Sequence, residues 1–193
     1  MNFVSRRCAG GFTLVELAIV IAILALLGVG IYVFTDVGGR GKAVTLLNFM
    51  QQTGGALQRL KADTGCQTQR LPGLWANANN TAANTFCGVA IADGAWKGPY
   101  MKPFSVDTTS NAGVLDNIIS GARLSVNREA GGIGQRYFLR TANVPNDLVI
   151  QALQECNGST ATNATFDTNK CRGTPGTGAT GNGSFDYLYD ETR

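Results

Sequence analysis

A single carboxylate stands near the start of the longest apolar run of this sequence. From Phe12 to Phe34 the chain is almost entirely apolar, contains no lysine or arginine, and has Glu16 as its only carboxylate. A charge in a hydrocarbon environment costs about 2.5 kcal/mol or more, so such a group is expected to have a charged partner and a function. Cleavage between Gly11 and Phe12 would create a cation, a new amino terminus one helical turn from Glu16, on the same chain or a neighbour.

Groups suited to catalysis are scarce in this chain. It contains no histidine, the commonest general base and metal ligand, and no G-x-S-x-G nucleophile elbow. We therefore expect no catalytic residue and predict that the protein is not an enzyme. The formal net charge is only +3, with no long basic stripe, so no specific nucleic-acid binding is predicted either.

Nucleotide and metal sites also lack their sequence requirements. The stretch GTGATG at 176–181 has the letters of a dinucleotide-binding loop, but it lacks the strand, the helix and the later acidic residue that this site needs. The stretch GGRGK at 38–42 lacks the spacing of a phosphate-binding loop. The aspartates that could hold calcium form no D-x-D-x-D loop; they are Asp107, Asp116, Asp167, Asp186 and Asp190. We expect no cofactor and no metal ion.

Cysteine spacing favours disulfides over a metal or redox site. Cys8 precedes the apolar run, and the other four cysteines form no C-x-x-C pair. An even set of cysteines outside the cytoplasm is more often bridged than free. Of three possible connectivities, the simplest pairs Cys66 with Cys87 and Cys156 with Cys171.

The apolar run predicts a membrane-spanning helix over residues 12–34. A helix of this length rises about 1.5 Å per residue and can cross a hydrocarbon core of roughly 30 Å. A secretory signal peptide has an apolar core of only about 7 to 15 residues, with small residues after it. Here the small residues Ala9, Gly10 and Gly11 come before the run.

An amphipathic helix is predicted to follow over residues 35–62. One face carries the apolar or small residues Ala43, Leu47, Met50, Gly54 and Leu57 at helical spacing. The opposite face carries mostly amides and cations. The glycines at 38–41 leave two alternatives open, a plain linker or a continuous helix softened at this point.

Residues 63–193 are rich in Asn, Thr and Gly and are expected to form a small globular domain. A long loop is predicted over 64–104, and it includes the aromatic stretch at 95–104. That stretch is either a ligand platform or, as we favour, a plug at the edge of the core. Strands are predicted at 122–129, 134–142 and 183–193, and a short helix at 144–156. A long helix on a small antiparallel sheet gives an α+β fold.

The stretch G-F-T-L-V-E, with a short basic leader before it and an apolar run after it, resembles the class III signal of type IV pilins and type II secretion pseudopilins. The resemblance implies that prepilin peptidase cuts after Gly11 and methylates Phe12. It also implies that Glu16 pairs with the terminal amine of the adjacent subunit during assembly. Many pilins have a proline within the apolar segment, whereas the first proline here is Pro72.

The resemblance further implies a domain order, a location and partners. The leader is residues 1–11, the transmembrane and filament-core helix 12–34, its amphipathic continuation 35–62, and the periplasmic or extracellular pilin-like domain 63–193. Partners are the peptidase, other pilin subunits, the inner-membrane assembly platform and, before assembly, membrane lipid. The pair Cys156–Cys171 resembles the carboxy-terminal disulfide loop of many pilins.

The sequence therefore predicts a structural subunit of a type IV pilus or pilus-like filament, either a pilin or a minor pilin. A pseudopilin of a type II secretion system is the nearest alternative. A single-pass anchored periplasmic binding module and a secreted hydrolase with a signal anchor are further alternatives, and neither explains the Gly11–Phe12 bond or Glu16.

Overall fold

The computed structural model describes residues 14–131, 134–162, 165–177 and 181–192, without the side chains of residues 22 and 24–37. The chain separates into two compact units, Met1–Gly38 and Gly39–Arg193. Each unit is described by itself.

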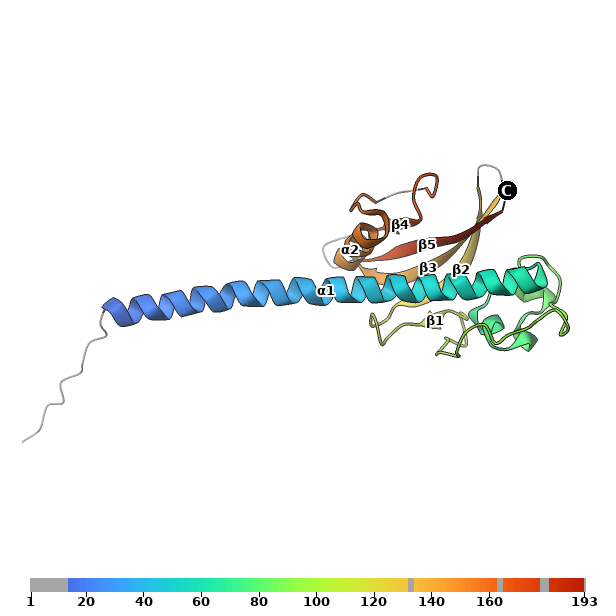
Figure 1. Ribbon diagram of the computed structural model, residues 1–193, viewed down its shortest axis with the longest axis horizontal. Coiled ribbons are helices and arrows are strands. Elements are labelled where there is room, and N and C mark those ends of the chain that lie inside the picture. The colour runs from blue at the N-terminus through green and yellow to red at the C-terminus, as the bar shows by residue number, and fades with distance from the viewer. Residues whose placement is uncertain (1–13, 132–133, 163–164, 178–180, 193) are drawn as a thin grey trace, which may run out of the picture. The chain divides into compact units, whose positions relative to one another are not determined.

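Helix α1 (Leu14–Thr64) is the first element, and residues from both units contribute to it (Figure 1). Leucine, alanine and isoleucine dominate its first turns, and no proline interrupts it. Gly38, Gly39 and Gly41 all have helical backbone. The alternatives of a linker and a long continuous helix across the boundary between the two units both stay predictions.

The second unit contains one antiparallel sheet with the strand order β1-β2-β3-β5-β4. The strands are β1 (Gly113–Val114), β2 (Arg123–Ala130), β3 (Gln135–Pro145), β4 (Cys171–Thr174) and β5 (Asn182–Thr192). Helix α2 (Asn146–Asn157) connects β3 to the segment before β4, and Figure 1 shows it beside β4 and β5. The predicted α+β class is confirmed.

The predicted hairpin, the short helix and the last strand are all present, at β2–β3, α2 and β5. Strands β1 and β4 were not predicted, because two and four residues are too few to show a period-two pattern. The predicted loop after α1 contains three single-turn 3-10 helices, Leu71–Leu74, Asn77–Asn79 and Ala82–Asn84.

The core of the second unit forms where residues 43–60 of α1 pack against the sheet. The buried positions of this helical segment are Ala43, Leu46, Leu47, Met50, Thr53, Gly54, Ala56, Leu57 and Leu60. Gly54 allows a close approach of the helix to β5, because a Cβ atom there would lie 2.7 Å from the Cβ of Tyr189. The predicted amphipathic pattern is thus confirmed, including the face that contains Met50 and Leu57.

Charged side chains occupy the other face of the sheet. Asp186 on β5 is fully buried and accepts hydrogen bonds from Arg140 on β3 at 2.8 Å and from Arg172 on β4 at 2.7 Å. These residues are direct cross-strand neighbours in the register. The guanidinium of Arg172 also stacks on Phe138 and on Phe166, at 4.8 and 4.3 Å from the ring centroids. Phe166 comes from the loop between α2 and β4, so this loop covers part of the outer face.

The free edge of β4 is capped by a side chain. The Asn157 carboxamide donates to the Cys171 carbonyl at 2.8 Å and accepts from the Cys171 N–H at 3.2 Å. These are the two bonds that a neighbouring strand would make at this position. The cap therefore reduces the tendency of this edge to pair with another chain.

Candidate functional site: the N-terminal segment and the exposed face of α1

Glu16 is the acidic residue of the first turn of α1. The first turn of a helix carries unsatisfied N–H groups and a partial positive charge, so a carboxylate there is favourable. Gly11 and Phe12, the predicted cleavage and methylation residues, lie outside the described residues, as does Cys8. Their roles and the pairing of Glu16 therefore stay predictions.

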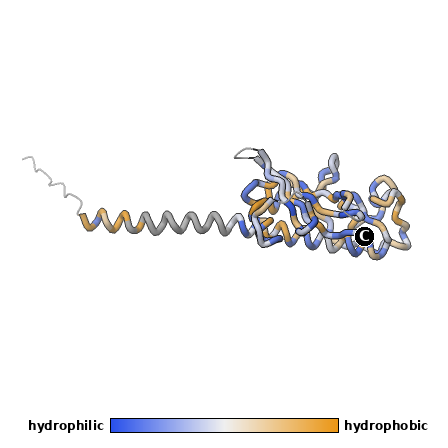
Figure 2. Tube along the Cα trace, turned by 90° about the horizontal axis from the view of Figure 1, so that it is seen from above, coloured by the Kyte–Doolittle hydropathy of each residue, from blue (hydrophilic) through white to orange (hydrophobic). Residues whose placement is uncertain are grey.

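Large apolar side chains around Glu16 are exposed in the single chain. They are Leu14, Val15, Leu17, Ile19, Val20, Ile21 and Ile23, and the first turns of α1 are accordingly mostly orange in Figure 2. A continuous exposed apolar surface of this kind marks a place where protein or lipid is bound. In the described part of the chain, no helix combines the length and hydropathy of a membrane span.

A second exposed surface lies on α1 within the globular unit, on the side away from the sheet. Between Lys42 and Arg59 the helix has no charged residue, although Val44, Thr45, Asn48, Gln51 and Gln52 are exposed. We call this the uncharged face. The amides of this face were predicted from the sequence, whereas its lack of charge was not, although the sequence between Lys42 and Arg59 contains that signal.

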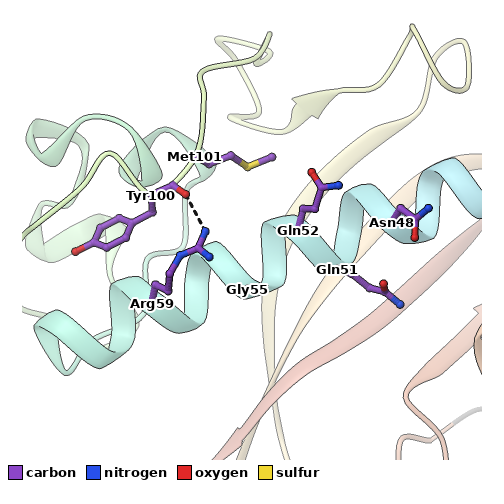
Figure 3. Close-up of a pocket in the computed structure, with 7 residues that line it drawn as sticks. All are labelled: Asn48, Gln51, Gln52, Gly55, Arg59, Tyr100 and Met101. Carbon is purple, nitrogen blue, oxygen red and sulfur yellow. Dashed lines mark hydrogen bonds between the residues drawn. The ribbon is translucent and has the colours of Figure 1, made fainter.

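The uncharged face borders a shallow groove of about 540 Å³. Figure 3 shows its lining, with the helix residues below and the loop residues across from them: Asn48, Gln51, Gln52, Gly55, Arg59, Tyr100 and Met101. The Arg59 guanidinium donates to the Tyr100 carbonyl at 3.0 Å and ties the helix to the loop. The groove presents carboxamide donors and acceptors.

The aromatic stretch at 95–104 mainly packs against the core. Phe104 contacts Phe49 of α1 and Trp75, with ring centroids 5.2 and 5.3 Å apart, and Trp96 meets Tyr100 at 5.8 Å. Burial raises the pKa of the Tyr100 hydroxyl, which donates a 2.9 Å hydrogen bond to Asp63. The favoured interpretation of this stretch, a plug at the core edge, is confirmed for these rings.

The cysteines of the globular unit are bonded in the pairs that sequence order predicts. Cys66–Cys87 has an S–S distance of 2.00 Å, and Cys156–Cys171 has one of 1.94 Å. The first disulfide fixes the loop after α1, and the second closes the loop that carries Phe166.

The aspartates considered for calcium bond different partners. Asp167 bonds Arg136, Asp186 bonds two arginines, and Asp107 accepts from the backbone N–H groups of Thr109 and Ser110. Among the described residues, no group of three or more His, Cys, Asp or Glu could hold a metal ion. Of the GTGATG stretch, residues 178–180 lie outside the description.

Residues 6–32 match the family described as the prokaryotic N-terminal methylation motif. This motif is a class III prepilin signal, characteristic of type IV pilins and pseudopilins, and it marks a substrate of prepilin peptidase that assembles with other pilin subunits. No curated protein and no solved structure matches this chain significantly.

Proposed function

We propose that this protein is a structural subunit of a type IV pilus or pilus-like filament, a pilin or a minor pilin. The observation that carries the proposal is the methylation motif at residues 6–32. In this proposal the leader is removed after Gly11, Phe12 becomes the methylated terminus, and the segment 12–34 holds the protein in the inner membrane until assembly. The globular domain then faces the periplasm.

The exposed apolar side chains of α1 support assembly through this helix. Leu17, Ile21 and Ile23 are exposed in the single chain and avoid water equally well in lipid and in a bundle of like helices. Transfer from membrane to filament core therefore carries little hydrophobic cost. The charge of Glu16 gives the direction and the axial register, because its amine partner sits on a neighbouring terminus.

The arrangement of the globular unit supports the proposal of a pilin-like subunit. Residues 43–60 of α1 cover one face of a single antiparallel sheet, as expected for a pilin-like head. The uncharged face of the same helix offers amides and Gly55 where a solvated helix usually has charges. A surface of this composition is suited to contact with another protein, because charged residues are depleted in the centres of protein interfaces.

The test is substitution of the intramembrane acid. Glu16→Val is expected to leave cleavage intact and to reduce filament yield strongly, because an unpaired terminal amine must then enter the filament core. Cleavage is read from the mass of the mature amino terminus, and yield from sheared filaments. The matched control is Asp36→Val, which removes one carboxylate beyond the apolar run. Wild-type filament yield with Glu16→Val would contradict the proposal.

A pseudopilin of a type II secretion system remains the second candidate, because the same motif is characteristic of both classes. The abundance of this chain in purified native pili tests the pilin assignment. A high abundance supports a major pilin, and a low abundance at a tip supports a minor pilin. Loss of secreted enzymes on deletion, without loss of pili, supports the pseudopilin. An unprocessed Met1 in cells that contain the peptidase would instead support a single-pass anchored binding module.

A further inference from the structure

The loop of residues 96–104 is held rigidly against the end of α1. The Tyr100 N–H donates to the Leu74 carbonyl at 2.8 Å, and its hydroxyl donates to Asp63 at 2.9 Å. Its carbonyl accepts from Arg59 at 3.0 Å. A loop fixed in this way loses little conformational freedom when a partner binds it.

Three cations without a carboxylate partner among the described residues belong to this loop or to the helix beside it. Six other arginines and lysines of the globular unit are paired with carboxylates within 4 Å, in Arg40–Glu155, Lys61–Asp190, Arg123–Asp116, Arg136–Asp167, Arg140–Asp186 and Arg172–Glu129, whereas the salt bridges of the described residues include none to Lys42, Arg70, Arg128 or Lys170. In the described part of the chain, Arg59, Lys97 and Lys102 have no such ion pair. Asp63, whose carboxylate accepts from the Tyr100 hydroxyl, offsets only one of these three positive charges. The surface around the loop is therefore left with net positive charge.

Two hollows meet at the same loop. One is the groove beside the uncharged face, where Asn48, Gln51 and Gln52 have side-chain amides with no hydrogen-bond partner among the described residues. The other is a hollow of about 310 Å³ with a mainly apolar lining of Pro99, Tyr100, Met101, Lys102 and Pro103. Tyr100 and Met101 line both hollows. We call the whole the Tyr100 surface: the two hollows together with Lys97.

We propose that the Tyr100 surface binds an extended acidic segment of a partner protein. Carboxylates of the segment meet Arg59, Lys97 and Lys102, and an apolar side chain enters the hollow between Pro99 and Pro103. The peptide groups of the segment exchange hydrogen bonds with the helix amides. This inference goes beyond the proposed function and does not require filament assembly.

The chemistry of the lining favours a peptide over a nucleic acid. Carboxamides present both donors and acceptors, and a peptide backbone offers both in return. A phosphodiester backbone offers acceptors only, so the amide carbonyls would face phosphate oxygens. In addition, the hollow between Pro99 and Pro103 suits an alkyl side chain. The rings of Tyr100 and of the adjacent Trp96 are not free as stacking platforms for bases, because they pack on each other and on the core.

The test measures binding of two probes to the full chain in a non-ionic detergent, by fluorescence anisotropy. One probe is a labelled ten-residue peptide of alternating aspartate and leucine, and the other is an oligothymidylate of similar charge. The test variant is Lys97→Gln with Lys102→Gln. The matched control is Lys42→Gln with Arg70→Gln, which removes the same charge from exposed positions outside the surface.

We expect saturable peptide binding that weakens about tenfold in the test variant and less than about twofold in the control. Replacing the leucines of the peptide by serine should also weaken binding to the unmodified protein, by several fold. No saturable peptide binding, or equal losses in test and control variants, would overturn the proposal. Oligothymidylate bound as tightly as the peptide, with the same dependence on Lys97 and Lys102, would also overturn it and indicate a general polyanion site. Circular dichroism checks that both variants are folded.

Discussion

The inner face of the sheet is apolar, whereas its outer face carries charged side chains that are paired among themselves. On the inner face, Leu124, Leu139 and Phe185 pack under α1 in one continuous core. On the outer face, Asp186 is as deeply buried as those residues, but its neighbours are arginines. Adjacent positions 185 and 186 of one strand thus belong to two different environments.

The two faces of this small sheet are stabilised in different ways. The inner face gains from removing apolar area from water, and this gain tolerates many substitutions of similar volume. The outer face depends on complete pairing, because a buried charge that loses its partner is costly. The outer face is therefore expected to be the less tolerant of the two to removal of one side chain.

The largest effect is expected at Asp186. Asp186→Ala leaves Arg140 and Arg172 without their shared carboxylate and should lower the free energy of unfolding by about 3 kcal/mol. The control is Asp116→Ala, which removes an exposed ion pair with Arg123 and should cost less than about 1 kcal/mol. Urea unfolding followed by the fluorescence of Trp75 and Trp96 measures both. Equal losses would show that burial of the outer pair has no special cost.

A loss of similar size is expected when the loop over the outer face is released. Cys156→Ser with Cys171→Ser opens a loop with a sequence separation of 15, which is worth about 3 kcal/mol in the chain-entropy model. Phe166 is then held over Phe138 less firmly, so binding of an apolar dye should increase as well. If the urea midpoint of this variant equals that of the unmodified protein under oxidising conditions, the disulfide does not stabilise the outer face.

A smaller effect on the inner face is expected at Gly54. A methyl group there meets Tyr189, so Gly54→Ala should cost about 1 to 3 kcal/mol. The neighbouring glycine is a close control, because nothing lies within 4 Å of a Cβ at Gly55. Gly55→Ala should stabilise the helix by up to about 1 kcal/mol. The idea of close helix–sheet approach fails if the two variants unfold at the same urea concentration.

The smallest effect concerns pH and the exposed rim of the outer face. The Arg136 guanidinium holds the pKa of Asp167 below its usual value. A carboxylate whose pKa is lower in the folded state contributes stability above its unfolded pKa of about 3.9, and this stability is lost as pH falls through the folded value. Urea midpoints measured from pH 7 to pH 3 should therefore fall below about pH 4. Asp167→Asn should show a shallower fall, and an unchanged slope would remove Asp167 from the outer network.

Sequence patterns predicted the inner face well and the outer face poorly. The spacing of Met50, Gly54 and Leu57 identifies a buried helix face, because the helical period alone brings them together. Nothing in the sequence pairs Asp186 with Arg140 and Arg172, which lie 46 and 14 positions away. Their contact depends on the register of three strands, one of them too short to predict.

The residues that indicate function also divide into a contiguous set, which the sequence reveals, and a set that only the fold brings together. The Gly11–Phe12 bond, Glu16 and the apolar run are contiguous, so the sequence by itself determined the class III signal, and with it a filament subunit as the favoured function. The Tyr100 surface joins residues from α1 and from a loop some forty positions later. Only the tertiary structure could decide which cations stay unpaired, because pairing depends on distances in space and a sequence fixes distances only along the chain.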